Sequence, residues 1–222
     1  MTAANRAHVV RSPQFWWRVA TLAACLVGLS TGNHRLVFFT IQSNVIVFAY
    51  VAGALYWMLR RGTTDAPAPR LRGGVVTWIL TTALVSHVLL NLGANPLPGL
   101  VVADPDTALA NRSLFLLHYV VPAMVLVDWL LFGPRRAVRW RDAALWLLYP
   151  AAYAVVTLAR GVLFPTIADR FPYPFLDIDA LGPGGVALGI VQVVVVIAVI
   201  AIGVIALDRA SAAVGDLVQR RR

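Results

Sequence analysis

The sequence predicts an all-α, polytopic integral membrane protein, a six-transmembrane-helix bundle with both termini cytoplasmic. Hydrophobic residues make up 59% of the 222 positions and charged residues only 13%. The mean hydropathy is +0.75, far more apolar than a soluble domain of this length requires. The arginines are also sorted among the loops in the way that fixes the orientation of membrane proteins.

Six apolar stretches are long enough to cross a bilayer, which takes about 20 residues for roughly 30 Å of hydrocarbon. They cover residues 14–31, 36–59, 74–95, 112–132, 143–164 and 184–207. These spans leave no room for a separate soluble domain, and no internal repeat is visible. Residues 1–222 are therefore expected to form a single six-span membrane domain.

The positive charge follows the predicted topology. The chain has a net charge of +9, and its basic residues other than histidine are all arginine. In the six-span arrangement one side carries Arg6, Arg11, Arg18, Arg60, Arg61, Arg70, Arg72, Arg135, Arg136, Arg139, Arg141, Arg209, Arg220, Arg221 and Arg222. The other side carries Arg35, Arg112, Arg160 and Arg170. The positive-inside rule makes the first side cytoplasmic, with anionic headgroups rather than nucleic acid as its partner.

The first two spans differ in their polar content. The first holds Arg18 and the single cysteine, Cys25, which excludes an intrachain disulfide. The second holds Thr40, about 6 Å inside its outer boundary if the helix begins at residue 36. Ser43 and Asn44 follow at i+3 and i+4, on the same helix face.

The next three spans bring polar groups to the same depth. The third offers His87 and, one turn nearer the outside, Asn91. The fourth offers His118, about 9 Å inside its boundary at residue 112. The fifth has Arg160 near its outer end. Such groups are costly in hydrocarbon unless they face one another or a wet cavity, so we expect an outward-facing polar pocket.

The loop between the last two spans is the expected lid of this pocket. Residues 164–185 are rich in proline, glycine and aromatic side chains, with Tyr173 among them. Such a composition favours a packed loop over a mobile one. The glycine-rich stretch at 182–185 is expected to start the last helix.

Each polar residue also has a structural interpretation. A threonine in a membrane helix usually donates to the carbonyl four residues earlier. His87 and Asn91 would serve as an interhelical hydrogen-bond pair, and Arg160 would extend to the interface. A lone membrane histidine such as His118 more often has a functional reason.

One acidic side chain stands apart from this layer. Asp128 lies near the cytoplasmic end of the fourth span and is expected to pair with Arg135 and Arg136 in the loop that follows.

Several chemistries fit the sequence poorly. Two membrane histidines without a carboxylate at their depth make a weak metal site, so no metal is expected. Neither nucleotide-binding nor serine-hydrolase motifs occur, and no cofactor is expected. Broken helices in symmetric pairs and charged pore rings, the marks of transporters and channels, are also missing from the sequence.

Three segments carry a resemblance to a known family. They are Phe38-Phe39-Thr40-Ile41-Gln42-Ser43-Asn44, then Leu117-His118-Tyr119-Val120-Val121-Pro122 with Asp128 after it, and Tyr173-Pro174-Phe175-Leu176-Asp177 followed by Gly182-Pro183. In order and spacing the chain resembles the androgen-induced gene 1 family and its bacterial membrane relatives. The proline follows His118 by four residues, where animal members have five.

The resemblance implies an activity. Members of that family are multi-pass membrane hydrolases that act on fatty acid esters of hydroxy fatty acids, with a threonine and a histidine as catalytic residues. Those residues correspond here to Thr40 and His118, and no cofactor is implied. A bacterial inner (plasma) membrane is the expected location.

The residues alone leave the function open among three classes. A hydroxyl and an imidazole at one depth are a possible nucleophile and base. Candidates for binding the substrate or its oxyanion are Asn44, His87, Asn91, Arg160 and Tyr173. The alternative is a non-catalytic membrane protein that binds a lipid or small molecule in the same pocket, or a scaffold whose polar layer only joins helices. Membrane lipids and a lipid ester are the expected partners, and the oligomeric state is not predicted.

Overall fold

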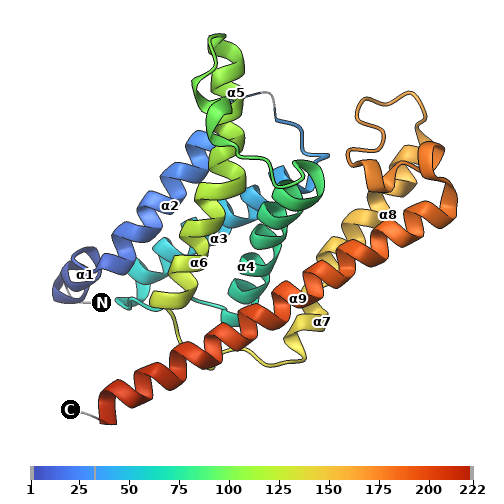
Figure 1. Cartoon of the computed structure of the whole chain (residues 1–222). Helices are drawn as coiled ribbons and strands as arrows, with labels where there is room; N and C mark the ends of the chain where they lie inside the picture. The colour runs from blue at the N-terminus through green and yellow to red at the C-terminus, as the bar shows by residue number, and fades with distance from the viewer. Residues whose placement is uncertain (1–2, 33, 221–222) are drawn as a thin grey trace.

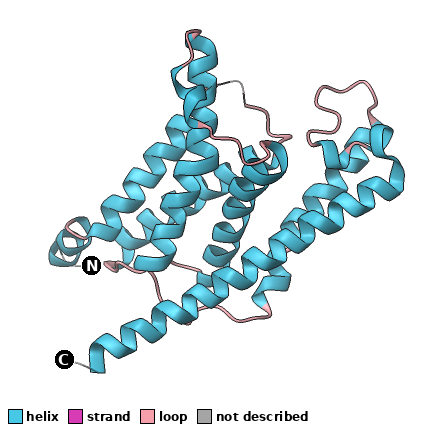
Figure 2. Ribbon diagram, viewed as in Figure 1, coloured by secondary structure: helices cyan, strands magenta, loops and turns pink. Residues whose placement is uncertain are grey.

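The computed structural model describes residues 3–32 and 34–220, and within them every regular element is a helix (Figure 2). Two of the predicted cytoplasmic arginines, Arg221 and Arg222, lie outside the described residues. The α-helices are α1 (Ala3–Val10), α2 (Pro13–Ser30), α3 (Phe39–Arg61), α4 (Pro69–Leu84), α5 (Pro105–Phe115), α6 (Val121–Leu131), α7 (Asp142–Trp146), α8 (Leu148–Leu163) and α9 (Ile178–Arg220). Two π-helical segments, η1 (Val85–Leu90) and η3 (Leu116–Val120), and two 3₁₀ turns, η2 (Leu97–Val101) and η4 (Pro174–Leu176), complete the set.

Five helical stretches are long and apolar enough to cross a membrane, as far as the described residues go. They are Phe39–Arg61, Pro69–Leu90, Pro105–Leu131, Asp142–Leu163 and Ile178–Ala213. The all-α prediction is confirmed for the described part of the chain. The remaining predicted span corresponds to α2, an 18-residue helix that is less apolar because Arg18 and other polar side chains occupy its first half.

Several helix boundaries differ from those expected from hydropathy. The fourth predicted span begins at Pro105, seven residues earlier than expected, because the Asp104 side chain caps the helix by accepting the Thr107 N–H at 2.9 Å. The second begins at Phe39, so Thr40 is the second residue of α3 rather than a residue one turn inside it. Helix α9 is broken at Gly182, whose φ of +66° is not helical.

Helices α2, α3, α4 and α6 pack against one another, and α9 runs across α4 and α6 (Figure 1). Val47, Met58, Ile79, Val121 and Ile205 are fully or almost fully buried between them. Helix α8 packs against the start of α3 and against α4, where its Tyr149 ring lies 5.2 Å from the Phe39 ring and 4.8 Å from the Trp78 ring.

Helices α8 and α9 also present apolar side chains outward. Val155, Val156 and Val199 are 67%, 65% and 64% exposed. Apolar surface of this kind is costly in water, so these faces suit contact with lipid.

A buried ion-pair cluster joins α2, α4 and α6. Asp128 accepts from Arg18 at 2.9 Å and from Arg72 at 2.8 Å, and both arginines are almost fully buried. Asp128 therefore pairs inside the bundle and not with Arg135 as predicted, because the Arg135 guanidinium donates to the Ser211 carbonyl. The rotation of α6 turns the carboxylate into the bundle, where it offsets two charges that are expensive to bury alone.

Candidate functional site

Thr40 and His118 meet between α3 and η3. Thr40 Oγ1 lies 3.2 Å from His118 Nε2, within hydrogen-bond reach. The threonine is 8% exposed, and the imidazole is half-buried. Because Thr40 lies in the first turn of α3, no helical carbonyl stands four residues before it, and its hydroxyl is not held in the back-bond usual for threonine.

Each histidine of the predicted polar layer lies in a π-helical segment. His87 lies in η1 and His118 in η3. The Asn91 N–H donates to the Ser86 carbonyl, and the Val121 N–H donates to the Leu116 carbonyl, each five residues earlier. Such wide turns are rare in helices and are frequent at functional sites.

The tautomer of His118 follows from its second nitrogen. Nδ1 lies 2.8 Å from the carbonyl oxygen of Leu114, which can only accept, so Nδ1 carries the proton. Nε2 is then an acceptor that faces the Thr40 hydroxyl. A hydroxyl that donates to a neutral imidazole has the arrangement of a nucleophile and its general base.

A second hydroxyl–imidazole pair in the chain lacks this arrangement. His34 Nε2 lies 2.7 Å from Ser113 Oγ, but also 2.8 Å from the Gly28 carbonyl and 3.0 Å from the Thr31 carbonyl. This nitrogen must therefore carry a proton and donate. Ser113 in turn donates to the Gly28 carbonyl at 2.8 Å, so the pair closes the end of α2 and holds no base.

Tyr173 fixes the end of the helix that carries Thr40. Its hydroxyl accepts the Thr40 N–H at 3.4 Å, a donor that the first turn of a helix leaves free. Its ring stacks on Phe175 with a centroid distance of 5.3 Å and meets Phe38 edge-on. Burial raises the pKa of the Tyr173 phenol, and hydrogen bonds to Thr40 and Phe39 oppose this shift. The phenol thus stays protonated, and its O–H remains a donor.

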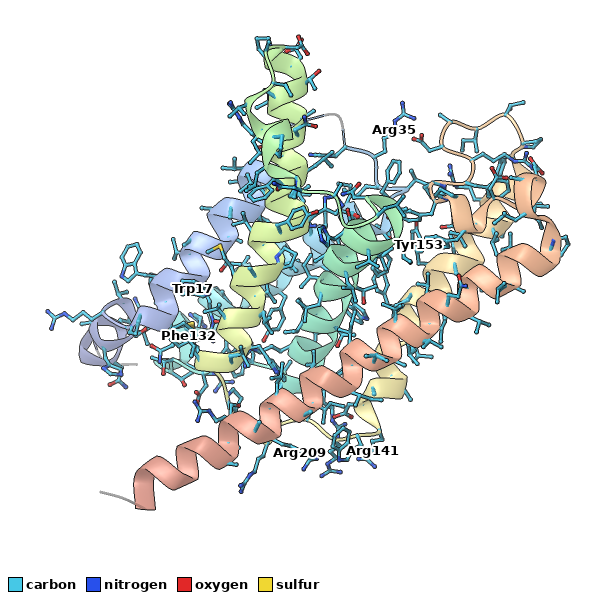
Figure 3. All side chains as sticks on the ribbon, viewed as in Figure 1. Trp17, Arg35, Phe132, Arg141, Tyr153 and Arg209 are labelled. Carbon is cyan, nitrogen blue, oxygen red and sulfur yellow. The ribbon has the colours of Figure 1, made fainter. Side chains whose placement is uncertain are left out.

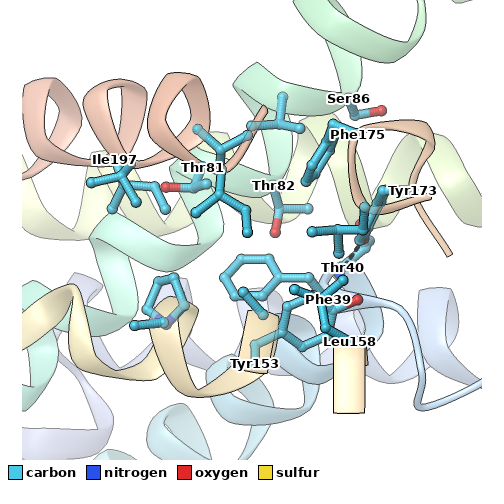
Figure 4. A pocket seen from close by; sticks show the side chains of 18 of the residues that line it. Phe39, Thr40, Thr81, Thr82, Ser86, Tyr153, Leu158, Tyr173, Phe175 and Ile197 are labelled. Carbon is cyan, nitrogen blue, oxygen red and sulfur yellow. Dashed lines mark hydrogen bonds between the residues drawn. The ribbon is translucent and has the colours of Figure 1, made fainter. Parts of the chain in front are cut away.

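An apolar cavity of about 230 Å³ opens beside Thr40, between α3, α4, α8 and α9 (Figure 4). Aromatic and aliphatic side chains line most of it, and hydroxyls line the rest. The lining residues are Phe39, Thr40, Thr81, Thr82, Val85, Ser86, Leu90, Pro150, Ala151, Tyr153, Ala154, Val155, Leu158, Tyr173, Phe175, Leu176, Ile190, Val193, Val194 and Ile197.

A second, polar cavity of about 410 Å³ opens beside His118. It is lined by Ser86, Asn91, Ala94, Asn95, Pro96, Gly99, Asn111, Leu114, Phe115, His118 and Tyr119. The Thr40–His118 contact therefore joins two spaces of opposite character, and Ser86 lines both of them.

The other predicted site residues take different positions. Asn44 is fully buried and donates to the carbonyls of Thr40 and Leu117, at 2.9 and 3.2 Å. Both of its N–H groups are thus used, so Asn44 braces the site instead of binding an oxyanion. Asn91 is exposed and lines the polar cavity beside His118.

His87 and Arg160 serve elsewhere. His87 Nδ1 contacts the Tyr119 hydroxyl at 3.1 Å, so its partner across the helices is Tyr119 and not Asn91 as predicted. Arg160 donates to the carbonyls of Asp169 and Arg170 and so anchors the loop after α8. It lines neither of the two cavities beside the Thr40–His118 contact. It lines a third cavity, of about 500 Å³, together with Gln42 and Tyr149.

Sequence reasoning missed two contributors, the Leu114 carbonyl and Ser86. The role of the Leu114 carbonyl cannot be read from the sequence, since every residue has a backbone carbonyl. Ser86 could have been noticed, because it continues a series of hydroxyl residues along one helical stretch, formed by Thr77, Thr81, Thr82 and Ser86.

The chain was also compared with known proteins. No protein-family model, curated protein or solved structure matched it.

Proposed function

We propose that the protein is an intramembrane threonine hydrolase that cleaves lipid esters, such as fatty acid esters of hydroxy fatty acids. The main support is the 3.2 Å contact between Thr40 Oγ1 and His118 Nε2. This nitrogen is unprotonated because the proton of the neutral ring is on Nδ1, which donates to the Leu114 carbonyl. The proposal includes membership of the androgen-induced gene 1 family, on the three segments described above.

In the proposed reaction, His118 Nε2 takes the Thr40 hydroxyl proton while Oγ1 attacks the ester carbonyl carbon. The tetrahedral intermediate collapses as the imidazolium gives its proton to the departing alkoxide, which leaves as an alcohol. The acyl group then remains on Thr40. A water molecule then attacks this acyl ester as His118 takes its proton. The imidazolium returns that proton to the departing Thr40 oxygen, which releases the carboxylic acid and restores the free threonine and the neutral imidazole.

The oxyanion of each intermediate needs hydrogen-bond donors. Tyr173 supports this role because its hydroxyl accepts from Thr40 N–H and keeps its own proton to donate. The position of Thr40 at the start of α3 adds the positive end of the helix dipole.

The two cavities support an amphipathic substrate. In this proposal the acyl chain occupies the apolar cavity, and the hydrophilic part of the ester and the attacking water occupy the polar cavity. A soluble ester without a long chain would leave most of the apolar cavity unfilled. The substrate class is therefore a lipid ester.

We also propose how the chain is oriented in the membrane. We infer that α2 is a sixth span and that both termini are cytoplasmic in a bacterial inner membrane. In support, Arg141 and Arg209 lie at one end of the bundle and Arg35 at the other (Figure 3). The end with Arg141 and Arg209 would then face the cytoplasm and contact anionic headgroups.

A fluorophosphonate probe tests the proposal directly. The purified protein in detergent should form an adduct that mass spectrometry locates at Thr40, and Thr40→Ala and His118→Ala should abolish it. Ser113→Ala is the matched control, because its hydroxyl also contacts an imidazole but has no base, and it should label like wild type. No adduct in a folded wild type would instead favour a non-catalytic lipid-binding protein.

A further inference from the structure

Ser86 differs from the other hydroxyl residues of its helix. Thr77, Thr81 and Thr82 each donate to the carbonyl four residues earlier, at 2.9, 2.9 and 3.3 Å. Over residues 3–32 and 34–220, the Ser86 hydroxyl has no hydrogen-bond partner, although the residue is only 7% exposed. The hydroxyl is therefore free to bond to a molecule in either cavity that Ser86 lines.

The difference coincides with a change in helix geometry. Ser86 is the second residue of η1, immediately after the α-helical geometry of α4 ends. The three threonines that donate to the previous turn all lie within α4. The free hydroxyl therefore stands at the position that reaches the site.

The location of Ser86 indicates what the free hydroxyl serves. It lines the apolar cavity together with Thr40, and it lines the polar cavity together with His118. In Figure 4 it lies on the Phe175 side of the apolar cavity, with Tyr173 and Thr40 at the same end. An ester carbonyl attacked by Thr40 must lie at this junction.

We propose that Ser86 is a catalytic residue whose hydroxyl donates a hydrogen bond to the carbonyl oxygen of the ester, and to the oxyanion that forms from it. This inference rests on the proposed hydrolase function. Asn44 has no free N–H for the task, and Arg160 lies outside both cavities. Ser86 from η1 and Tyr173 from the loop before α9 then supply two donors.

The test compares Ser86→Ala with wild type on 4-nitrophenyl octanoate and on its thionoester. Removal of one oxyanion donor typically lowers kcat by about 10²–10³-fold, so Ser86→Ala should lose that factor with little change in KM. Sulfur accepts hydrogen bonds weakly, so wild type should strongly prefer the oxygen ester. Ser86→Ala should lose most of this preference, whereas Ser86→Thr, which keeps a hydroxyl, should retain it.

Thr77→Ala is the matched control, because Thr77 lies on the same helix but lines neither cavity, and its hydroxyl already donates to the Gly73 carbonyl. It should keep the wild-type kcat and ester preference. A reactive wild type whose Ser86→Ala variant keeps its kcat, or loses activity equally on both esters, overturns the role of Ser86 alone. A wild type that is neither labelled at Thr40 nor hydrolytic removes the proposed function, and this inference with it.

Discussion

Asn44 donates a hydrogen bond to the carbonyl oxygen of Leu117, the residue before His118, at 3.2 Å. Its other N–H serves the carbonyl of Thr40 at 2.9 Å. One amide thus holds the backbones of both dyad residues. The separation of Thr40 Oγ1 and His118 Nε2 depends on this brace as well as on the two side chains.

Asn44→Ala should therefore lower hydrolysis and stability together. Leaving buried carbonyls without donors costs about 1–3 kcal/mol, which should appear as a lower midpoint in thermal unfolding in detergent. Hydrolysis should fall more than tenfold, since the dyad loses its shared support. A variant that is destabilised yet hydrolyses at the wild-type rate would contradict the bracing role.

Because the Tyr173 phenol is buried, the free energy of unfolding should fall at alkaline pH. Burial raises its pKa above the ordinary value of 10.0, so above that pH the unfolded chain releases a proton that the folded protein keeps. The contribution of this group is fully present below pH 10 and is lost as the pH rises through the raised pKa, by up to about 1.4 kcal/mol per pH unit. Unfolding free energies of wild type and Tyr173→Phe, measured from about pH 9 to pH 12, should show the shallower slope in the variant.

Asp128→Asn should be among the most destabilising changes in the chain. It would leave Arg18 and Arg72 buried without a countercharge, and breaking a buried ion pair typically costs about 3–5 kcal/mol. Asp65→Asn is the control, because Asp65 is exposed. Chemical unfolding in mixed micelles measures both, and equal stabilities would refute the structural role of the cluster.

Gly161→Ala should disturb the loop that holds Tyr173. A Cβ at Gly161 would lie 2.3 Å from Cε1 of Phe171, so the aromatic ring must move. We expect about a tenfold loss of hydrolysis and faster protease cleavage of residues 164–177. Gly53→Ala has nothing within 4 Å of its new Cβ, and it should gain up to about 1 kcal/mol from helix propensity without affecting activity.

Hydropathy and residue type predict much of this molecule. The apolar stretches locate all the long helices, and the shared depth of Thr40 and His118 predicts that they lie close together. The depth of a residue in the membrane can be estimated from the sequence because the rise per residue is constant along a helix. The rotation of a helix about its axis cannot be estimated in this way, so the sequence directs Asp128 toward the loop that follows it, whereas the structure pairs it with Arg18 and Arg72.

The π-helical turns also escape sequence reasoning. Val85–Leu90 and Leu116–Val120 contain ordinary apolar residues, and tertiary packing rather than local propensity selects the wider turn. The roles of Ser86 and of the Leu114 carbonyl follow from that geometry. They become visible only once the neighbouring helices are in place.

The wide turn at Leu116–Val120 makes the dyad depend on the length of the chain as well as on its side chains. Such a turn accommodates an extra residue, and each residue of an α-helix advances the face by about 100°. Deleting one residue there would keep a threonine and a histidine in the sequence but turn the imidazole toward another neighbour. A protein that carries both residues therefore places them in contact only if the number of residues between the start of the helix and the histidine is also the same.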